Sequence, residues 1–357
     1  MTDSAFKIEY IEYLDRNGTL KQSLPKGIAD REALIKIYRT MVLTRVFDLA
    51  AINLQRTGAM GTYPSGEGQE AIGTAIGTAM LEHDVFVPYY RDVATQIQRG
   101  VLLEEILLYW GGDERGSAFK HQPEDFPLCV PIATQSCHAV GIAFAIKYRK
   151  QPRVVLTTCG DGATSKGDFY ESINIAGAMN LPLVFVVNNN QWAISVSRDQ
   201  QTASKTIAQK AFAAGFGGIQ VDGNDPLAVF QVVQEALELA RNQHRPTLIE
   251  AITYRLGDHT TADDASRYRE QQDLENARQL EPLIRFKSFI SKEFEWIEKD
   301  DKELYDDCKQ QVKIAAENYQ ETTEQKPGEF FDYMFEKPTM NLIQQKEEFL
   351  DGEKRHG

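Results

Sequence analysis

Two short polar stretches in the middle of the sequence carry residue types that can bind a metal ion. Gly160-Asp161-Gly162 follows the apolar run "RVVLTTC", and Asn188-Asn189-Asn190 follows the apolar run "LPLVFVV". Carboxylate and amide oxygens suit hard cations, and Mg²⁺ typically binds a few protein oxygens together with phosphate oxygens. The same residue types are also common in turns, because their side chains bond locally. Each stretch taken alone leaves both interpretations open.

The spacing of the two stretches favours a shared site. Roughly 30 residues separate Asp161 from Asn190, which is the length of one strand–helix–strand unit. Ligands of open parallel sheets bind beyond the carboxyl ends of the strands, so the spacing predicts Asp161 and Asn190 side by side at that edge. We expect Asn188 and Asn189 to close the strand as turn residues. Neither the P-loop pattern nor a strand-following G-x-G-x-x-G occurs, which disfavours a nucleotide-binding oxidoreductase.

The elements that must position these residues alternate along the chain. Between residues 135 and 255, helical patterns such as "CHAVGIAFAIKYRK" alternate with strand patterns such as "PTLIEAIT". This alternation predicts an α/β fold with a parallel sheet flanked by helices on both faces. We expect an N-terminal arm over residues 1–30, the α/β domain over residues 31–280, and a helical C-terminal extension with a polar tail over residues 281–357.

Composition excludes several classes of protein. The net charge of −13, without a cluster of Lys and Arg, argues against a nucleic-acid partner. The apolar runs are too short for a membrane span, and the sequence "MTDSAFKIEY" matches no targeting pattern. The four cysteines form no C-x-x-C pair, so we expect them to be reduced and to behave as small, buried hydrophobic residues. They are Cys129, Cys137, Cys159 and Cys308.

Further motifs occur in order along the chain: "GEGQEA", "YYRDV", "VPIATQ", "VDGNDPLAV" and "GDHTTADDASRYR". Together with them, "GDGATSKGDFYESINIAGAMNLPLVFVVNNNQWAIS" resembles the thiamine-diphosphate motif, in which GDG precedes NN by about 30 residues. From about residue 30 to residue 345 the chain resembles the alpha subunit of the decarboxylating component of 2-oxo acid dehydrogenase complexes. The resemblance implies a thiamine-diphosphate-binding fold and thiamine-diphosphate-dependent oxidative decarboxylation of a 2-oxo acid.

The resemblance also implies roles for individual residues. It makes Asp161, Asn190 and the backbone carbonyl of Trp192 the ligands of Mg²⁺. It assigns diphosphate binding to Tyr90 and Arg91 and to the backbone of Gly162 and Ala163, an aminopyrimidine contact to the main chain of Ile132, and a catalytic, cofactor-facing place to the loop residue His259. In part of the family a K⁺ site lies at the equivalents of Pro131, Thr134 and Gln135.

Three positions depart from the family pattern. The family usually has Tyr or Phe where Trp192 stands, which matters little if only the carbonyl binds. Asp258 stands where relatives have Gly or His, and a carboxylate beside His259 is expected to raise the pKa of the imidazole. Some relatives carry a histidine in the glycine-rich loop where this chain has "TYPSG", a segment that is expected to line the substrate side. Asp263 and Asp264 are expected to cap or order the segment around His259, and the other histidines receive no function.

The resemblance implies a missing partner as well. In this family a beta chain supplies the glutamate at the aminopyrimidine ring, and we find no matching acid in this chain. We therefore expect a heterotetramer of two alpha and two beta chains in the bacterial cytoplasm, which passes its acyl group to a lipoyl-bearing acyltransferase. Pyruvate is the expected substrate, with branched-chain 2-oxo acids and acetoin as alternatives. A non-catalytic scaffold subunit that only keeps the fold is an alternative of a different class.

Overall fold

The computed structural model describes residues 7–322, 326 and 328–356. The chain forms two compact units, residues 1–316 and 317–357. The helices are α1 (Arg31–Arg56), α2 (Glu70–Ala79), α3 (Val93–Arg99), α4 (Leu103–Trp110), α5 (Thr134–Tyr148), α6 (Gly167–Met179), α7 (Arg198–Gln201), α8 (Lys210–Ala213), α9 (Pro226–Gln243), α10 (Gln271–Arg278), α11 (Pro282–Phe294), α12 (Glu298–Glu321), α13 (Glu329–Asp332) and α14 (Met340–His356).

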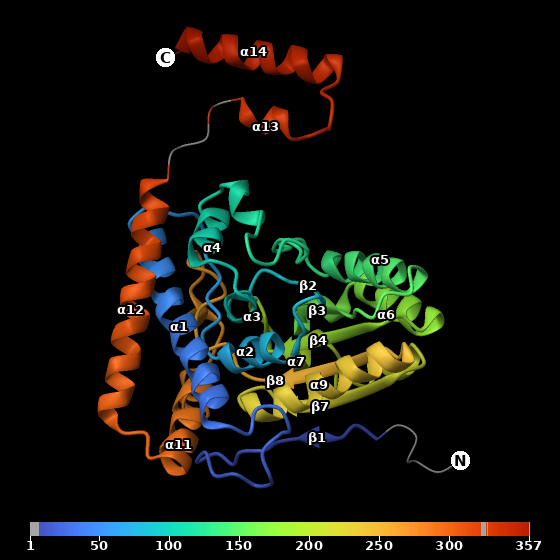
Figure 1. Ribbon diagram of the computed structural model, residues 1–357, viewed down its shortest axis with the longest axis vertical. Helices are drawn as coiled ribbons and strands as arrows, with labels where there is room; N and C mark the ends of the chain where they lie inside the picture. The colour runs from blue at the N-terminus through green and yellow to red at the C-terminus, as the bar shows by residue number, and fades with distance from the viewer. Residues whose placement is uncertain (1–6, 323–325, 327, 357) are drawn as a thin grey trace. The chain divides into compact units, whose positions relative to one another are not determined.

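A six-stranded sheet forms the centre of the first unit (Figure 1). Its strands are β1 (Tyr10–Ile11), β2 (Val85–Val87), β3 (Val155–Gly160), β4 (Leu183–Asn189), β7 (Gly217–Asp222) and β8 (Thr247–Ile252). They lie in the order β1-β7-β8-β4-β3-β2, and every neighbouring pair is parallel. The α/β fold with a parallel sheet is therefore confirmed, and the N-terminal segment adds β1 to its edge.

Helices cover both faces of the sheet, as the alternating pattern predicts. On one face, α5 and α6 lie side by side and pack on β2, β3 and β4, while α9 covers β4, β7 and β8 on the other (Figure 1). The side chains of Leu183, Phe185 and Val187 join the core beneath α5 and α6, because alternate residues of a strand point to the same face. The small-residue helix α2 lies deep in the molecule, against α3 and α9, and its residues from Glu70 to Ile76 are all buried.

The helix α9 and the N-terminal segment share one buried carboxylate. Asp225 caps α9 through the backbone N–H groups of Leu227 and Ala228, at 3.0 and 3.2 Å. Its other oxygen accepts hydrogen bonds from the backbone N–H groups of Tyr13 and Leu14, at 2.7 and 2.6 Å. One side chain therefore both starts a helix and fastens the N-terminal segment to the domain.

The cysteines divide into two pairs with different surroundings. None of the four forms a disulfide. Cys159 and Cys308 are buried, as expected, whereas Cys137 is exposed on α5 and Cys129 is half-buried. The expectation of buried cysteines was wrong for the second pair: Cys137 is exposed although its Sγ atom faces α6, where it accepts a hydrogen bond from Ser172 Oγ at 3.5 Å. Among the described residues no helix combines the length and the apolar character needed to cross a membrane.

The second unit contains α13 and α14. The rings of Phe330 and Phe331, on α13, lie 5.4 and 5.7 Å from the ring of Phe349 on α14, measured between centroids. Helices α13 and α14 lie within the expected helical extension, and α14 also takes in most of the segment "EEFLDGEKRHG" at its polar end. Aromatic packing joins the two helices.

Candidate active site

The carboxyl ends of β3 and β4 bring the two polar stretches together. The strands pair in register up to Gly160 and Asn188, so Asp161 and Asn190 leave neighbouring strands at the same edge. Both residues line one cavity of about 210 Å³. The nine residues singled out from the sequence all line this cavity; they are Tyr90, Arg91, Ile132, Asp161, Gly162, Ala163, Asn190, Trp192 and His259.

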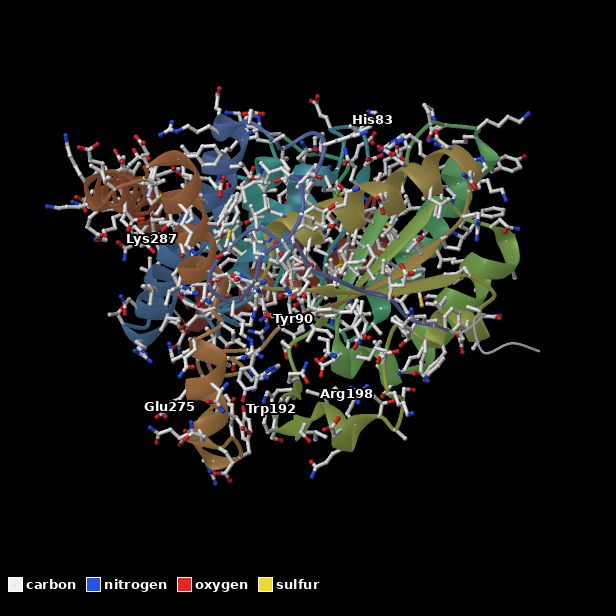
Figure 2. All side chains as sticks on the ribbon, turned by 90° about the horizontal axis from the view of Figure 1, so that it is seen from below. His83, Tyr90, Trp192, Arg198, Glu275 and Lys287 are labelled. Atoms are coloured by element: carbon white, nitrogen blue, oxygen red, sulfur yellow. The ribbon has the colours of Figure 1, made fainter. Side chains whose placement is uncertain are left out.

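The cavity draws on five segments of the chain. Tyr90 and Arg91 follow β2, Asp161 follows β3, Asn190 follows β4, and His259 lies in the loop after β8. The remaining segment precedes α5 and includes Ile132. Figure 2 shows Tyr90 and Trp192 in the same region, with Arg198 beside them, and His83 far from it at another edge of the molecule. The strand-end rule therefore accounts for most of the site.

One carboxylate oxygen of Asp161 has no hydrogen-bond partner among the described residues. This atom is Oδ2, and the side chain as a whole is about 1% exposed. Burial raises the pKa of the carboxyl group to about 6. An unpaired buried carboxylate is costly unless a cation completes its surroundings. No cluster of three or more His, Cys, Asp and Glu side chains occurs within the described ranges, so a cation here would need ligands of other kinds.

Asn190 and Trp192 supply two such oxygens. The Asn190 Oδ1 atom accepts a hydrogen bond from the backbone N–H of Trp192 at 3.2 Å, which leaves its second lone pair available. The amide nitrogen of Asn190 donates to Gln69 Oε1 at 3.2 Å. Trp192 begins the short hairpin of β5 (Trp192–Ala193) and β6 (Val196–Ser197), and its carbonyl accepts a hydrogen bond from Arg255 Nη1 at 3.3 Å.

Gly162 permits a close backbone approach at the cavity wall. Residues Asp161–Ser165 form a 3-10 turn, and a Cβ atom added at Gly162 would lie 2.6 Å from the Cβ atom of Ala193. The side-chain amide of Gln201 donates to the carbonyl oxygens of Asp161 and Gly162 at 3.2 and 3.3 Å. Gln201, on α7, therefore holds the turn in place, a contact that the sequence does not reveal because it joins residues 40 positions apart.

Two buried arginines flank His259. Arg91 Nη2 and Arg255 Nη1 each lie 3.3 Å from His259 Nδ1. Arg91 also donates to the carbonyl oxygen of His259 at 2.9 Å and to the carbonyl oxygen of Ser65. Arg255 is fully buried and donates to the carbonyl oxygen of Ile194 at 2.8 Å. No sequence motif pointed to Arg255, although it follows β8 as Asp161 follows β3, so the strand-end rule could have found it.

The expected effect of Asp258 on His259 was wrong. The carboxylate of Asp258 accepts a hydrogen bond from the backbone N–H of Ala265 at 2.9 Å and therefore serves the loop. Burial, followed by the positive charges of Arg91 and Arg255, lowers the pKa of the His259 imidazole to about 4. The ring is thus neutral near pH 7, and its Nδ1 atom, which faces two guanidinium donors, is the acceptor.

Asp263 and Asp264 order the loop around His259, as expected. Asp263 Oδ2 accepts hydrogen bonds from the backbone N–H of His259 at 2.8 Å and from the Tyr268 hydroxyl. Asp264 accepts a hydrogen bond from the backbone N–H of Ser266 at 3.2 Å, at the start of a 3-10 turn. The two aspartates therefore fix the backbone of the loop that carries the His259 imidazole.

The neutral state of His259 predicts a pH-dependent stability. An unfolded histidine has a pKa near 6.5, whereas the folded value is about 4. The unfolded chain therefore binds the proton more readily, and the wild type loses stability as the pH falls from about 6.5 towards 4. Compared with a His259→Asn variant, the wild-type Tm, followed by circular dichroism between pH 7.5 and 4, is expected to drop further. A difference between the two Tm values that does not change with pH would contradict the assignment.

Asn188 and Asn189 lie in the strand rather than in a turn. Both are buried residues of β4. Asn188 donates to the Tyr89 hydroxyl at 2.9 Å, and Asn189 donates to Glu250 Oε1 at 2.8 Å. The turn interpretation was wrong for their backbone, because both residues pair with neighbouring strands of the sheet. The side-chain nitrogens find distant partners, while Asn188 Oδ1 has none among the described residues. Local turn contacts also occur: Asn189 Oδ1 accepts hydrogen bonds from the backbone N–H and the side-chain amide of Gln191, at 3.3 and 3.1 Å, and the carbonyl oxygen of Asn188 accepts one from the backbone N–H of Asn190 at 3.0 Å.

The segment "TYPSG" does not line the cavity. Tyr63 is fully buried, and its hydroxyl donates to the buried carboxylate of Asp48. Asp48 also accepts hydrogen bonds from Ser65 Oγ and from the backbone N–H of Gly66, both at 2.7 Å. The segment instead helps to hold Arg91 in place, because the carbonyl oxygen of Ser65 accepts a hydrogen bond from the Arg91 guanidinium group.

The residues considered for K⁺ lie where α5 begins. Of the three, only Gln135 lines the cavity. Gln135 Nε2 donates to the carbonyl oxygen of Thr158 at 2.8 Å, and its buried Oε1 atom has no partner within the described part of the chain. The carbonyl oxygen of Pro131 already accepts a hydrogen bond from the backbone N–H of Thr134 at 3.3 Å.

Known proteins resemble this chain along nearly its whole length. The family model described as "Dehydrogenase E1 component" matches residues 38–328. A protein of Staphylococcus aureus (strain Mu50), named pyruvate dehydrogenase E1 component subunit alpha, is 38% identical over 357 aligned residues, which cover 99% of this chain and 96% of that protein. A protein of the same name from Staphylococcus epidermidis is 36% identical over the same shares. This chain belongs to the dehydrogenase E1 component family.

Proposed function

We propose that this chain is the alpha subunit of a heteromeric pyruvate dehydrogenase, which oxidatively decarboxylates pyruvate and transfers the acetyl group to a lipoyl group. The names of the two relatives described above support pyruvate as the substrate. The observation that carries the proposal is the convergence of the nine residues on one cavity, in a chain of the dehydrogenase E1 component family. Members of this family generally use thiamine diphosphate as their cofactor.

The residues present fit that cofactor with a Mg²⁺ ion. We assign the cation to Asp161, Asn190 and the carbonyl of Trp192, supported by the unpaired buried Oδ2 atom of Asp161. Arg91 and Tyr90 would hold the diphosphate, since a guanidinium fork suits phosphate oxygens. The backbone of Gly162 and Ala163 would approach the phosphates closely, because residue 162 has no Cβ atom.

We also assign the main chain of Ile132 to an aminopyrimidine contact. The free Oε1 atom of Gln135 supports a K⁺ ion bound there with Pro131 and Thr134.

When bound, thiamine diphosphate supplies the nucleophile that attacks the 2-oxo acid and the electron sink for the loss of carbon dioxide. The chain's own residues would bind and orient the cofactor and shield it from water. Arg91 and Arg255 hold the neutral ring of His259 by its Nδ1 atom, so the proton of that ring resides on Nε2. His259 can therefore donate a hydrogen bond within the cavity it lines, near the place where the lipoyl acceptor would enter.

A beta chain is needed to complete this site. Asp161 is the one carboxylate residue among those lining the cavity in the described part of the chain, and we assign it to the cation. The acid that acts at the aminopyrimidine ring must then come from another chain. Large apolar side chains are exposed at the cavity mouth and along the outer faces of α5 and α6: Ile132, Ile194, Phe144, Tyr148, Ile175 and Met179. Such surfaces mark protein interfaces, and we propose that the beta chain covers this one.

We further propose two alpha and two beta chains in the bacterial cytoplasm, working with a lipoyl-bearing acyltransferase. The names of the relatives, which specify an E1 component with an alpha subunit, and their bacterial sources support this arrangement.

Substrate choice tests the proposal. The assembled alpha and beta chains are expected to act on pyruvate with a kcat/KM at least about tenfold above that for 2-oxoisovalerate or acetoin. The two extra methyl groups of 2-oxoisovalerate in a fitted pocket typically change kcat/KM by this order, and acetoin lacks the carboxylate of a 2-oxo acid. The rate of reductive acylation of a lipoyl domain, measured with each substrate in parallel, provides the comparison. A higher kcat/KM for 2-oxoisovalerate or for acetoin would reassign the substrate and leave the cofactor site unaffected.

A further inference from the structure

The glutamine of "GEGQEA" lies directly behind the assigned cation ligand Asn190. Gln69 is buried, precedes the first turn of α2, and accepts a hydrogen bond at Oε1 from Asn190 Nδ2 at 3.2 Å. The same oxygen lies 3.4 Å from the Tyr89 hydroxyl, which in turn accepts a hydrogen bond from Asn188 Nδ2 at 2.9 Å. A buried chain of polar groups thus connects α2 with the end of β4.

An asparagine can bind a cation with only one end of its amide. The oxygen has lone pairs for the metal, whereas the nitrogen carries two hydrogens and would repel it. Rotation of the amide by half a turn exchanges the two atoms with little change in shape. Asn190 therefore needs a neighbour that distinguishes its two ends, and ligand-orienting neighbours of this kind commonly affect metal affinity by 10–100-fold.

Gln69 is such a neighbour. Its Oε1 atom can only accept, so it pairs with the nitrogen end of Asn190 and not with the oxygen end. The Tyr89 hydroxyl fixes which end of the Gln69 amide faces Asn190, because its oxygen accepts from Asn188 and its hydrogen is then free to be donated to the same Gln69 oxygen. The Nε2 atom of Gln69 has no partner among the described residues that would hold the reverse orientation. The backbone N–H of Trp192 favours the same orientation from the other side, since it donates to Asn190 Oδ1.

From this geometry we propose that Gln69 is a positioning residue that presents the Asn190 amide oxygen to the cation. Gln69 does not line the cavity, so it acts through Asn190. The proposal rests on the proposed function, because it takes Asn190 as a ligand of Mg²⁺ bound with thiamine diphosphate.

The experiment measures the Mg²⁺ concentration that gives half-maximal binding of thiamine diphosphate by the assembled alpha and beta chains. Gln69→Leu, which removes the acceptor, is expected to raise this concentration about tenfold, while the Tm of the metal-free assembly changes little. Gln69→Glu keeps an acceptor oxygen and is expected to recover most of the affinity. Gln96→Leu is a matched control, because Gln96 is also a buried glutamine but lies outside the site.

Three outcomes would overturn the proposal: an unchanged Mg²⁺ requirement in Gln69→Leu, an equal increase in Gln96→Leu, or no recovery in Gln69→Glu. A Gln69→Leu variant that is too unstable to assemble while Gln69→Glu assembles normally would also count against it, since it would show that the residue serves the fold. Asp161→Asn separates the two levels of inference. Mg²⁺-dependent binding that survives in Asp161→Asn would refute the proposed cation site itself, whereas its loss, combined with a normal Gln69→Leu, would refute only the role of Gln69.

Discussion

Replacing Asp161 by asparagine is expected to abolish Mg²⁺-dependent binding of thiamine diphosphate and to lower turnover by roughly a hundredfold or more, since an inner ligand should matter at least as much as the outer neighbours of a metal site. Among the described residues that line the cavity, the change removes the one carboxylate, whose Oδ2 atom has no partner there, and puts an amide in its place. The substitution is nearly isosteric, so packing around the 3-10 turn is retained.

The same substitution is expected to leave the metal-free protein as stable as the wild type, or more stable. Burial raises the pKa of the Asp161 carboxyl group to about 6 because the ionised form is poorly solvated. An amide carries no such charge, so its burial costs less at pH 7. Thermal unfolding with and without Mg²⁺ and thiamine diphosphate measures both effects, and the stabilisation by ligand is expected to vanish in the variant.

A matched control for Asp161→Asn is Asp307→Asn. Asp307 is exposed on α12 and pairs with Arg39 at the surface, where such ion pairs contribute little. Cofactor binding by this control is expected to match the wild type. If Asp161→Asn bound thiamine diphosphate as tightly as Asp307→Asn at every Mg²⁺ concentration, the ligand assignment would be wrong, and a scaffold that merely keeps the fold would become the better description.

The purified alpha chain alone is expected to show no turnover of pyruvate above background, and addition of the beta chain is expected to restore it. The physical reason is the missing acid, because the cavity lining within the described residues has no carboxylate beyond Asp161. General acid–base catalysis typically contributes about 10²–10⁴-fold, and a half-open site also leaves the reacting centre in water.

Reductive acylation of a lipoyl domain, measured with alpha alone, beta alone and the mixture, provides the measurement. Size-exclusion chromatography of the mixture verifies assembly, and Asp161→Asn alpha chain with wild-type beta chain is the inactive control for the same assembly. Turnover by the alpha chain in the absence of any beta chain would disprove the shared-site arrangement.

Parts of this site could be predicted from the sequence because they depend on local pattern and topology. Alternating helices and strands imply a parallel sheet, and parallel strands bring Asp161 and Asn190 to one edge although roughly 30 residues separate them. Gly162 could be read in the same way, since a glycine after a strand indicates a close backbone approach.

Other parts could not be predicted because their causes lie far along the chain. The contact of Gln69 with Asn190 joins residues 121 positions apart, and that of Arg91 with His259 joins residues 168 apart. The sequence neighbour Asp258 suggested a raised pKa for His259, yet burial, followed by the charges of two arginines, lowers that pKa. Adjacency in sequence does not reveal which way a side chain points, and in a loop no regular period fixes that direction.

The sequence by itself determined the parallel α/β fold, the family and the set of residues that meet at the ends of the strands. The fold follows from the periodicity of apolar residues, and the family follows from the order of the motifs, neither of which requires knowledge of tertiary contacts. Only the tertiary structure decided the state of those residues: the neutral ring of His259, the unpaired oxygen of Asp161 and the orientation of the Asn190 amide. Protonation and hydrogen-bond direction depend on burial and on the nearest charges and donors, which packing sets and composition does not.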